Sequence, residues 1–220
     1  MTADGSTAIS VLIVDDHGLV REGMRALLLE EGIDVVGEAG SARDALRLAA
    51  DLAPDVVVLD IRLPDRHGVS IVDELRDVAP TSRVLLCSGS PDGTTLFEAA
   101  RSGSDGFVAK EAPNDEIVDA IRSVASGATV VGAQSAGLLY RGLQGHAPDA
   151  ERVERLSARE REVLGLLGRG MTNREIGRHL TISEKTARNH VSRILHKLSL
   201  RHRTEAAVFA LPMERHLVGD

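Results

Sequence analysis

The sequence predicts an α/β domain with a five-stranded, parallel, doubly wound sheet, followed by a small all-α domain. The first observation is that short runs rich in Val, Leu and Ile alternate with helix-length stretches whose apolar residues recur every three or four positions. The second is a stretch with five glycines and one proline, 127–150, after which only helical patterns remain. The third is the length of 220 residues, which suits two compact domains.

Five short apolar runs are the expected strands of the first domain. In chain order they are SVLIVDD, DVVGEA, DVVVLD, RVLLCS and GFVAK. A helix is expected after each run, because apolar residues such as Val20, Met24 and Leu27 follow at helical spacing. Strands that alternate with helices in this way form a parallel sheet with helices on both faces. The last of these helices is expected to end at Gly127.

Three helix starts mark the second domain. Ser157 in SARE and Thr172 in TNRE each stand three residues before a glutamate, which is the spacing of a capping box. Ser183 is expected to cap a third helix after a tight connection. A helix, a tight turn and a second helix together outline a helix-turn-helix.

These patterns divide the chain into three segments. We expect the first domain at 1–126 and the helix-turn-helix domain at 153–220. The segment between them, 127–152, reads as a linker, with one short helix expected from Ser135 to Leu143.

The net charge of −7 hides two segments of opposite sign. Residues 1–127 carry 11 Lys and Arg against 23 Asp and Glu, whereas residues 151–220 carry 14 against 9. The basic end of the chain therefore indicates a polyanionic partner. No apolar run approaches the roughly 20 residues of a membrane helix, and the N-terminus is too polar for a signal peptide, so we expect a cytoplasmic protein with no membrane partner. The single cysteine, Cys87, lies in an apolar run and is expected to be a buried thiol.

Polar side chains stand at the ends of four expected strands. Asp15 and Asp16 end the first run, Asp60 ends the third, Ser88 follows the fourth and Lys110 ends the fifth. Because the carboxyl ends of parallel strands share one edge, we expect these groups to converge in one cleft. Acids about 4 Å apart repel each other by about 4 kcal/mol at an effective dielectric near 20 unless a cation joins them. Hard oxygen ligands favour Mg²⁺, with Asp60 as a nucleophile toward a phosphoryl donor.

Residues 1–126 resemble the receiver domain of two-component response regulators. The resemblance rests on the acidic pair and on VVVLDIRLPDRHG, LLCSG and GFVAK. It implies a flavodoxin-like fold in which Asp60 accepts a phosphoryl group from a sensor histidine kinase. It further implies a Mg²⁺ site formed by Asp15, Asp16, Asp60 and the backbone carbonyl of Arg62.

The same resemblance implies a switch on the fourth and fifth strands. Ser88 would move to the phosphoryl oxygens, Lys110 would bind them, and Phe107 would turn inward. The competing interpretation of Phe107 is ordinary core filling. This chain departs from the family pattern at Cys87, directly before the switch serine, which changes the packing there.

The stretch SEKTARNHVSRILHKL, residues 183–198, is a basic amphipathic helix. On a helical projection its apolar residues fall on one side: Ala187, Val191, Ile194, Leu195 and Leu198. The opposite side is polar and basic. Its cations can contact phosphates, and Arg, Asn and Ser can hydrogen-bond to base edges in a major groove. A solvated surface without a partner is the competing interpretation.

Residues 156–207 resemble the LuxR-type helix-turn-helix, and the two matches together resemble the NarL/FixJ group of response regulators. This resemblance implies double-stranded DNA as a partner. It implies base contacts for Arg188, Asn189 and Ser192, although Ser192 is short where many relatives carry Lys or Arg. The phosphate contacts that it implies are Thr172, Asn173, Lys185, His190, Arg193 and Lys197.

The leading hypothesis is a transcription regulator whose affinity for promoter DNA rises when Asp60 is phosphorylated, acting as a homodimer. Any catalysis would concern only its own phosphorylation and dephosphorylation. One alternative is a Mg²⁺-dependent phosphatase that uses Asp60, but such enzymes usually carry a second acid where this chain has Arg62. Another is a regulator that senses a small apolar ligand, which fits poorly with the acidic cleft and an aromatic content of 2%.

Overall fold

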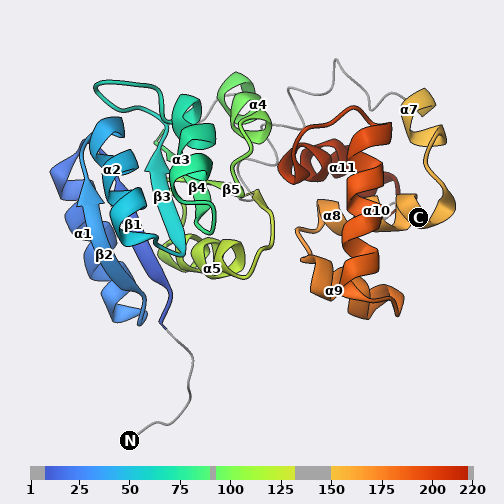
Figure 1. The fold of residues 1–220 in the computed structure, drawn as a ribbon, viewed down its shortest axis with the longest axis horizontal. Coiled ribbons are helices and arrows are strands. Elements are labelled where there is room, and N and C mark those ends of the chain that lie inside the picture. Colours follow the sequence, from blue (N-terminus) through green and yellow to red (C-terminus); the bar gives the residue numbers. More distant parts are fainter. Residues whose placement is uncertain (1–7, 90–92, 132–149, 218–220) are drawn as a thin grey trace, which may run out of the picture.

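The computed structural model describes residues 8–89, 93–131 and 150–217. It has an α/β part and a helical part that lie side by side (Figure 1). No helix among the described residues combines the length and the apolar character that crossing a membrane requires. The expected short helix at 135–143 lies outside the described residues.

A single parallel sheet forms the centre of the first part. Its strands are β1 (Ser10–Val14), β2 (Asp34–Ala39), β3 (Val56–Asp60), β4 (Arg83–Ser88), β5 (Gly106–Ala109) and β6 (Val130–Val131). Their order is β2-β1-β3-β4-β5-β6, and every neighbouring pair is parallel. The five expected strands and their parallel arrangement are confirmed.

The sixth strand corrects the expected count. β6 pairs with β5 through Gly106 and Val130, within a segment that the sequence predicted as a linker. Two residues are too few to show an alternating pattern, so periodicity could not reveal this strand. Its pairing depends on the exposed edge of β5, which is a tertiary feature.

Helices cover both faces of the sheet. They are α1 (Gly18–Glu30), α2 (Ala42–Leu52), the 3₁₀ turn η1 (Gly68–Ile71), α3 (Val72–Val78), α4 (Gly93–Arg101) and α5 (Asn114–Ala125). Leu12, Leu59 and Leu86 belong to one buried cluster with α2, α3 and α4, whereas their strand neighbours Ile13 and Val58 belong to another with α1 and α5. This division follows from the alternation of side chains along a strand.

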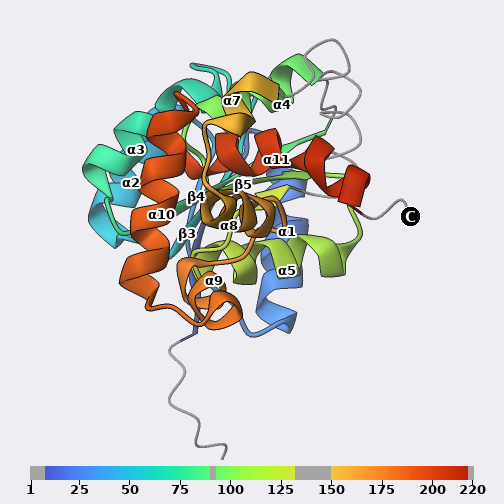
Figure 2. The ribbon, with the colours of Figure 1, turned by 90° about the vertical axis from the view of Figure 1, so that its right-hand side faces the viewer.

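The second part contains α7 (Ala150–Glu154), α8 (Ala158–Gly168), α9 (Asn173–Leu180), α10 (Glu184–Lys197) and α11 (Arg203–Leu217). The expected capping boxes at Ser157 and Thr172 are both present, and the Ser183 hydroxyl accepts a hydrogen bond from the Thr186 N–H. The apolar sides of α8, α9, α10 and α11 share one buried cluster that includes Leu164, Ile176 and Ile194. α10 runs along one side of this part, next to α9 and α8 (Figure 2).

The two parts meet through α11, which packs against α4 (Figure 1). Val208 of α11 lies in the same buried cluster as Phe107 of β5. The Thr204 hydroxyl donates to the Ser104 carbonyl, and both residues are buried. Gly103 has a φ of +85°, and a Cβ there would lie 2.8 Å from the His202 ring, so the imidazole fills the space that glycine leaves. A contact between the two parts therefore lies beside β5.

Candidate functional site

The structure brings the expected polar groups together at the carboxyl edge of the sheet. Asp15 follows β1, and Asp60 and Ser88 end β3 and β4; these three residues are 2–4% exposed. Asp16 is exposed. Lys110, directly after β5, pairs with Asp15 and places its Nζ 2.7 Å from Oδ2 of Asp60. The predicted convergence of the strand ends is confirmed.

One ammonium faces two buried carboxylates in this site. Burial of Lys110 acts to lower its pKa, but hydrogen bonds to Asp15 and Asp60 and their negative charges outweigh this effect, so the pKa is raised. Behind the site, burial raises the pKa of the Cys87 thiol to about 12. Cys87 is therefore an inert, buried thiol, as predicted.

The acidic groups fit a divalent cation. Asp15, Asp16, His17 and Asp60 each offer one ligand atom, and these atoms all lie within 4.8 Å of one another. Three carboxylates against the single charge of Lys110 leave negative charge that a hard cation can neutralise, and carboxylate oxygens are the ligands that Mg²⁺ prefers. Receiver-like acidic pockets of this composition therefore suit Mg²⁺ better than a softer metal.

Sequence reasoning missed His17. Its ring Nδ1 lies 2.7 Å from Oδ1 of Asp16, and its backbone N–H donates to Oδ1 of Asp15 over 2.9 Å. The available signal was its position directly after the acidic pair. The imidazole can orient the exposed Asp16 carboxylate at the mouth of the site.

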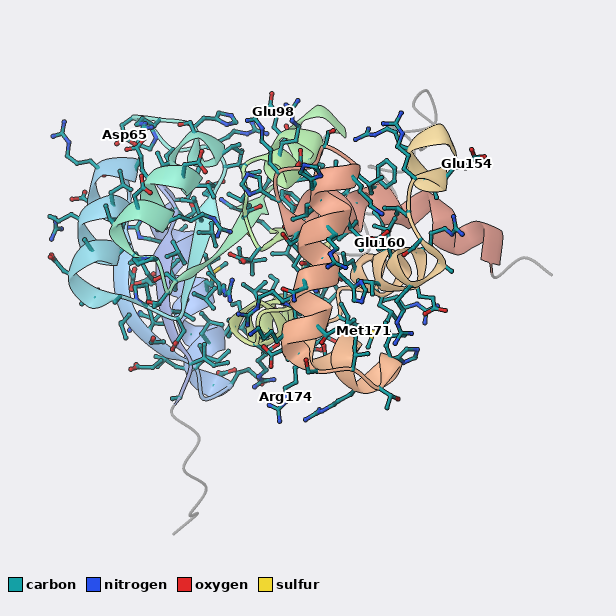
Figure 3. The ribbon with its side chains drawn as sticks, turned by 45° about the vertical axis from the view of Figure 1, so that its right-hand side comes forward. Asp65, Glu98, Glu154, Glu160, Met171 and Arg174 are labelled. Carbon is teal, nitrogen blue, oxygen red and sulfur yellow. The ribbon has the colours of Figure 1, made fainter. Side chains whose placement is uncertain are left out.

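The loop after β3 is tied to both Asp60 and α2. The Arg62 N–H donates to Oδ1 of Asp60 over 3.1 Å. Asp65, labelled in Figure 3, accepts hydrogen bonds from the N–H groups of Ala42 and Arg43 at the start of α2. These backbone donors lower the pKa of Asp65. The loop that carries the Arg62 carbonyl is thus held at two points, and sequence reasoning did not identify the second.

Gly68 lies where any larger residue would press on the backbone of β3. An ideal Cβ at Gly68 would lie 2.1 Å from the carbonyl oxygen of Asp60. We expect Gly68→Ala to lower the free energy of unfolding by about 2 to 3 kcal/mol, because backbone must move to relieve the overlap. Urea unfolding measures this change.

Gly23→Ala is the matched control for that substitution. Gly23 lies inside α1, and a Cβ there meets nothing within 4 Å. It should stabilise the protein by about 0.5 to 1 kcal/mol through helix propensity. Equal stability of Gly68→Ala and the wild type would show that the Asp60 backbone tolerates the added methyl group.

Phe107 is 4% exposed and already packed inside the molecule. It pairs across the sheet with Leu86 of β4 and Val131 of β6. Its buried cluster includes Val208 of the second part. Phe107 therefore belongs to the buried cluster that joins β5 with α11.

The predicted two-sided character of α10 is confirmed. Ala187, Val191, Ile194 and Leu198 are buried, and Leu195 packs against the same cluster. On the other side, the exposed residues are Lys185, Arg188, Asn189, Ser192, Arg193 and Lys197, with His190 partly exposed. The receiver-like part leaves this surface accessible. Arg174, which sequence reasoning passed over, extends into solvent from α9 (Figure 3).

Three of the predicted phosphate contacts have partners within the chain. The Thr172 hydroxyl is used in its capping box, and the Asn173 carbonyl Oδ1 accepts from Arg203 over 2.9 Å. Lys197 Nζ lies 2.7 Å from Oε2 of Glu160. Phosphate contacts by these three side chains stay predictions, and each requires an exchange of partners.

Lys197 is expected to stabilise the second part of the chain. Burial of Glu160 acts to raise its pKa, but Lys197 and Ser157 outweigh this effect and lower it. Lys197→Met should therefore lower the free energy of unfolding by about 1 to 2 kcal/mol at neutral pH. The loss is modest because the lysine is partly exposed. Since the folded pKa of Glu160 lies below its unfolded value, this contribution is lost as the pH falls through the folded pKa.

Thermal unfolding at pH 7 and near pH 3 tests this expectation. Lys185→Met removes the same charge from an exposed position of α10 and should leave stability nearly unchanged. A Lys197→Met variant as stable as Lys185→Met at pH 7 would contradict the role of the Glu160 pair.

Two family descriptions match the chain. Residues 11–122 match "Response regulator receiver domain", and residues 154–210 match "Bacterial regulatory proteins, luxR family". The chain is 37% identical over 208 residues to the DNA-binding transcriptional activator DevR/DosR of Mycobacterium tuberculosis, covering 94% of this chain and 96% of that protein. It is 33% identical over 202 residues to the nitrate/nitrite response regulator NarL of Escherichia coli, covering 91% of this chain and 94% of that protein. The crystal structure of the response regulator ChrA, from a heme-sensing two-component system, is similar with a TM-score of 0.52 and 30% identity, covering 96% of this chain and 99% of that one.

Proposed function

Because the chain belongs to the NarL/FixJ group of two-component response regulators, we propose that phosphorylation of Asp60 controls how tightly its LuxR-type domain binds promoter DNA. The observation that carries this proposal is the buried Asp60 carboxylate, held with Asp15 by Lys110, in a chain whose other domain exposes a basic helix. We propose a receiver domain at 1–126, a linker at 127–152 and the DNA-binding domain at 153–220.

Asp60 is the proposed nucleophile. Its carboxylate oxygen attacks the phosphorus of a phosphohistidine on a sensor kinase, the N–P bond breaks, and an acyl phosphate forms. Lys110 already contacts the Asp60 oxygen and can transfer its contact to the phosphoryl oxygens, and Ser88 on the neighbouring strand can donate its hydroxyl to them. The same groups would serve the chain's own dephosphorylation, in which water attacks the phosphorus.

Mg²⁺ is the proposed cofactor. Asp15, Asp16, Asp60 and the backbone carbonyl of Arg62 would hold it, and it would neutralise charge on the transferring phosphoryl oxygens. The acidic cluster supports this assignment because its ligand atoms lie within 4.8 Å of one another.

Double-stranded DNA is the proposed target of α10. Arg188, Asn189 and Ser192 lie on its exposed side, where a helix inserted in a major groove presents side chains to base edges. Around them, the proposed phosphate contacts are Thr172, Asn173, Lys185, His190, Arg193 and Lys197. Two copies bound to half-sites about one helical turn apart would form the active homodimer.

The α11 contact is the proposed route between the domains. Phosphoryl oxygens that recruit Ser88 change the packing at the carboxyl edge of β4, next to Phe107 on β5. Phe107 shares its buried cluster with Val208 of α11. A change in this cluster can loosen α11 and so alter dimerisation and DNA binding.

A phosphorylation-dependent gel shift tests the proposal. The protein is treated with acetyl phosphate and Mg²⁺, its phosphorylation is followed on a Phos-tag gel, and DNA flanking its own gene is titrated with each form. We expect a slower Phos-tag band and a higher DNA affinity for the phosphorylated form. A slower band without any change in DNA affinity would refute the proposed coupling.

Arg188→Ala is expected to weaken specific DNA binding by about 1 to 3 kcal/mol, because a base contact is lost. Within α10, Arg188 forms a 3.3 Å surface pair with Glu184, which costs little to exchange. Lys185→Met is the comparison, since loss of a phosphate contact should weaken binding to all sequences and reduce the salt slope by about 1. Fluorescence anisotropy on specific and scrambled duplexes distinguishes the two; equal losses on both duplexes for Arg188→Ala would exclude base reading.

A further inference from the structure

Arg21 of α1 contacts the main chain of the acidic pair. Its Nη1 donates to the carbonyl oxygen of Asp15 over 2.6 Å. Its Nε lies 3.4 Å from Oε2 of Glu38 on β2. The guanidinium also lies close to Gly40, where a Cβ would be 3.6 Å from Nη1. The side chain is 24% exposed, so these contacts are partly shielded from water.

The carbonyl that Arg21 binds belongs to the peptide unit that joins Asp15 to Asp16. Because this unit is planar, its orientation determines the direction in which both residues leave the loop. The Asp15 N–H is held separately, by donating to the Ala39 carbonyl over 3.0 Å. The Asp15 N–H belongs to the preceding peptide unit, so Arg21 supplies the attachment of the unit between Asp15 and Asp16 and restricts its rotation about the Asp15 Cα.

We propose that Arg21 is a positioning residue for the cation site: by holding the Asp15 carbonyl, it keeps the two carboxylates of the pair where Mg²⁺ can bind both. This inference rests on the proposed Mg²⁺ site. Groups that orient metal ligands without touching the metal typically change metal affinity by 10 to 100-fold when they are removed. Arg21 touches no ligand carboxylate, so its effect is expected to act through the backbone.

A purely structural role makes a different prediction. Arg21 and Arg25 both contact Glu38, Arg25 with its Nε 3.3 Å from Oε1. If Arg21 only linked α1 to β2, then Arg25→Met and Glu38→Gln would lower the Mg²⁺ affinity as much as Arg21→Met does. Of the side chains of Arg21, Arg25 and Glu38, only that of Arg21 bonds to the Asp15 carbonyl, so the three variants separate the two roles.

A titration of the full chain with Mg²⁺, in the absence of any phosphoryl donor, tests the inference. The amide NMR signals of residues 15–17 report the binding. We expect Arg21→Met to raise the Mg²⁺ dissociation constant about tenfold. Arg21→Lys should recover part of the affinity, because its ammonium can still donate to the carbonyl. Arg25→Met and Glu38→Gln should stay within about twofold of the wild type.

The possible outcomes separate this inference from the proposed function. Wild-type affinity in both Arg21→Met and Arg21→Lys would overturn the positioning role and leave the Mg²⁺ site intact. Equal losses in Arg21→Met, Arg25→Met and Glu38→Gln would also overturn it, in favour of a general role in the fold. A wild-type protein whose signals do not respond to Mg²⁺ would refute the proposed cation site itself. If a collapsed amide spectrum shows that Arg21→Met does not fold, the Mg²⁺ dissociation constants of Arg21→Lys and Arg25→Met are compared instead. A weaker affinity in Arg21→Lys alone supports the positioning role, and equal affinities overturn it.

Discussion

Asp60→Asn is expected to abolish phosphorylation and, at the same time, to stabilise the receiver domain. The amide of asparagine is not a nucleophile toward phosphorus, so no slower band should form on a Phos-tag gel after treatment with acetyl phosphate. Asp15 and Asp60 are both buried and share the single ammonium of Lys110. Removing one of the two charges relieves their mutual repulsion and leaves a balanced pair between Asp15 and Lys110. We expect about 1 kcal/mol of stabilisation, or about 2 to 4 °C in the midpoint of thermal unfolding.

Lys110→Met is the control variant, and it is expected to destabilise the protein where Asp60→Asn stabilises it. It removes the ammonium that pairs with two buried acids, and we expect it to lower the free energy of unfolding by about 3 kcal/mol because uncompensated buried charges remain. Asp16→Asn changes the same type of group at an exposed position and should leave stability nearly unchanged. A lower melting temperature for Asp60→Asn would contradict the electrostatic account, and a phosphorylated band in that variant would place the acceptor elsewhere.

Arg203→Met is expected to destabilise the DNA-binding domain and to loosen its contact with the receiver domain. The guanidinium donates to three acceptors: the Met171 carbonyl and Oδ1 of Asn173 in the DNA-binding domain, and the hydroxyl of Thr129, directly before β6 of the receiver sheet. Burial, together with the nearby charge of Arg83, lowers its pKa to about 10, so the group remains charged at neutral pH. Methionine cannot donate a hydrogen bond to any of these acceptors, and we expect the free energy of unfolding to fall by about 2 to 4 kcal/mol. Urea unfolding of the full chain measures it.

Thr129→Val separates the two consequences of losing Arg203. It removes only the acceptor that lies directly before β6, at a position that is 6% exposed, and keeps the shape of the side chain. We expect a cost of about 1 kcal/mol for this variant. Small-angle scattering should show a larger maximum dimension for both variants if the contact between the domains loosens. Equal costs for Thr129→Val and Arg203→Met would show that the contacts with Met171 and Asn173 contribute nothing to stability.

Local patterns were sufficient for most of the fold and for the central site. The five longer strands, the capping boxes at Ser157 and Thr172 and the two sides of α10 each depend on residues close together in the sequence. The convergence of Asp15, Asp60 and Lys110 followed from strand ends alone, because parallel strands place their carboxyl ends on one edge. β6 was missed because two residues carry no periodicity.

The remaining features depend on partners that are distant in the sequence. Asp65 binds the start of α2 from 23 residues away, Lys197 binds Glu160 across 37 residues, and Arg203 binds Thr129 across 74. No short pattern distinguishes a lysine that meets a phosphate from one that meets a buried glutamate, since both stand on the polar side of a helix. The amino-acid sequence by itself therefore determined the elements and the chemistry at their ends, through spacing along the chain. Only the tertiary structure decided which charged groups are already engaged, because that depends on which elements pack together.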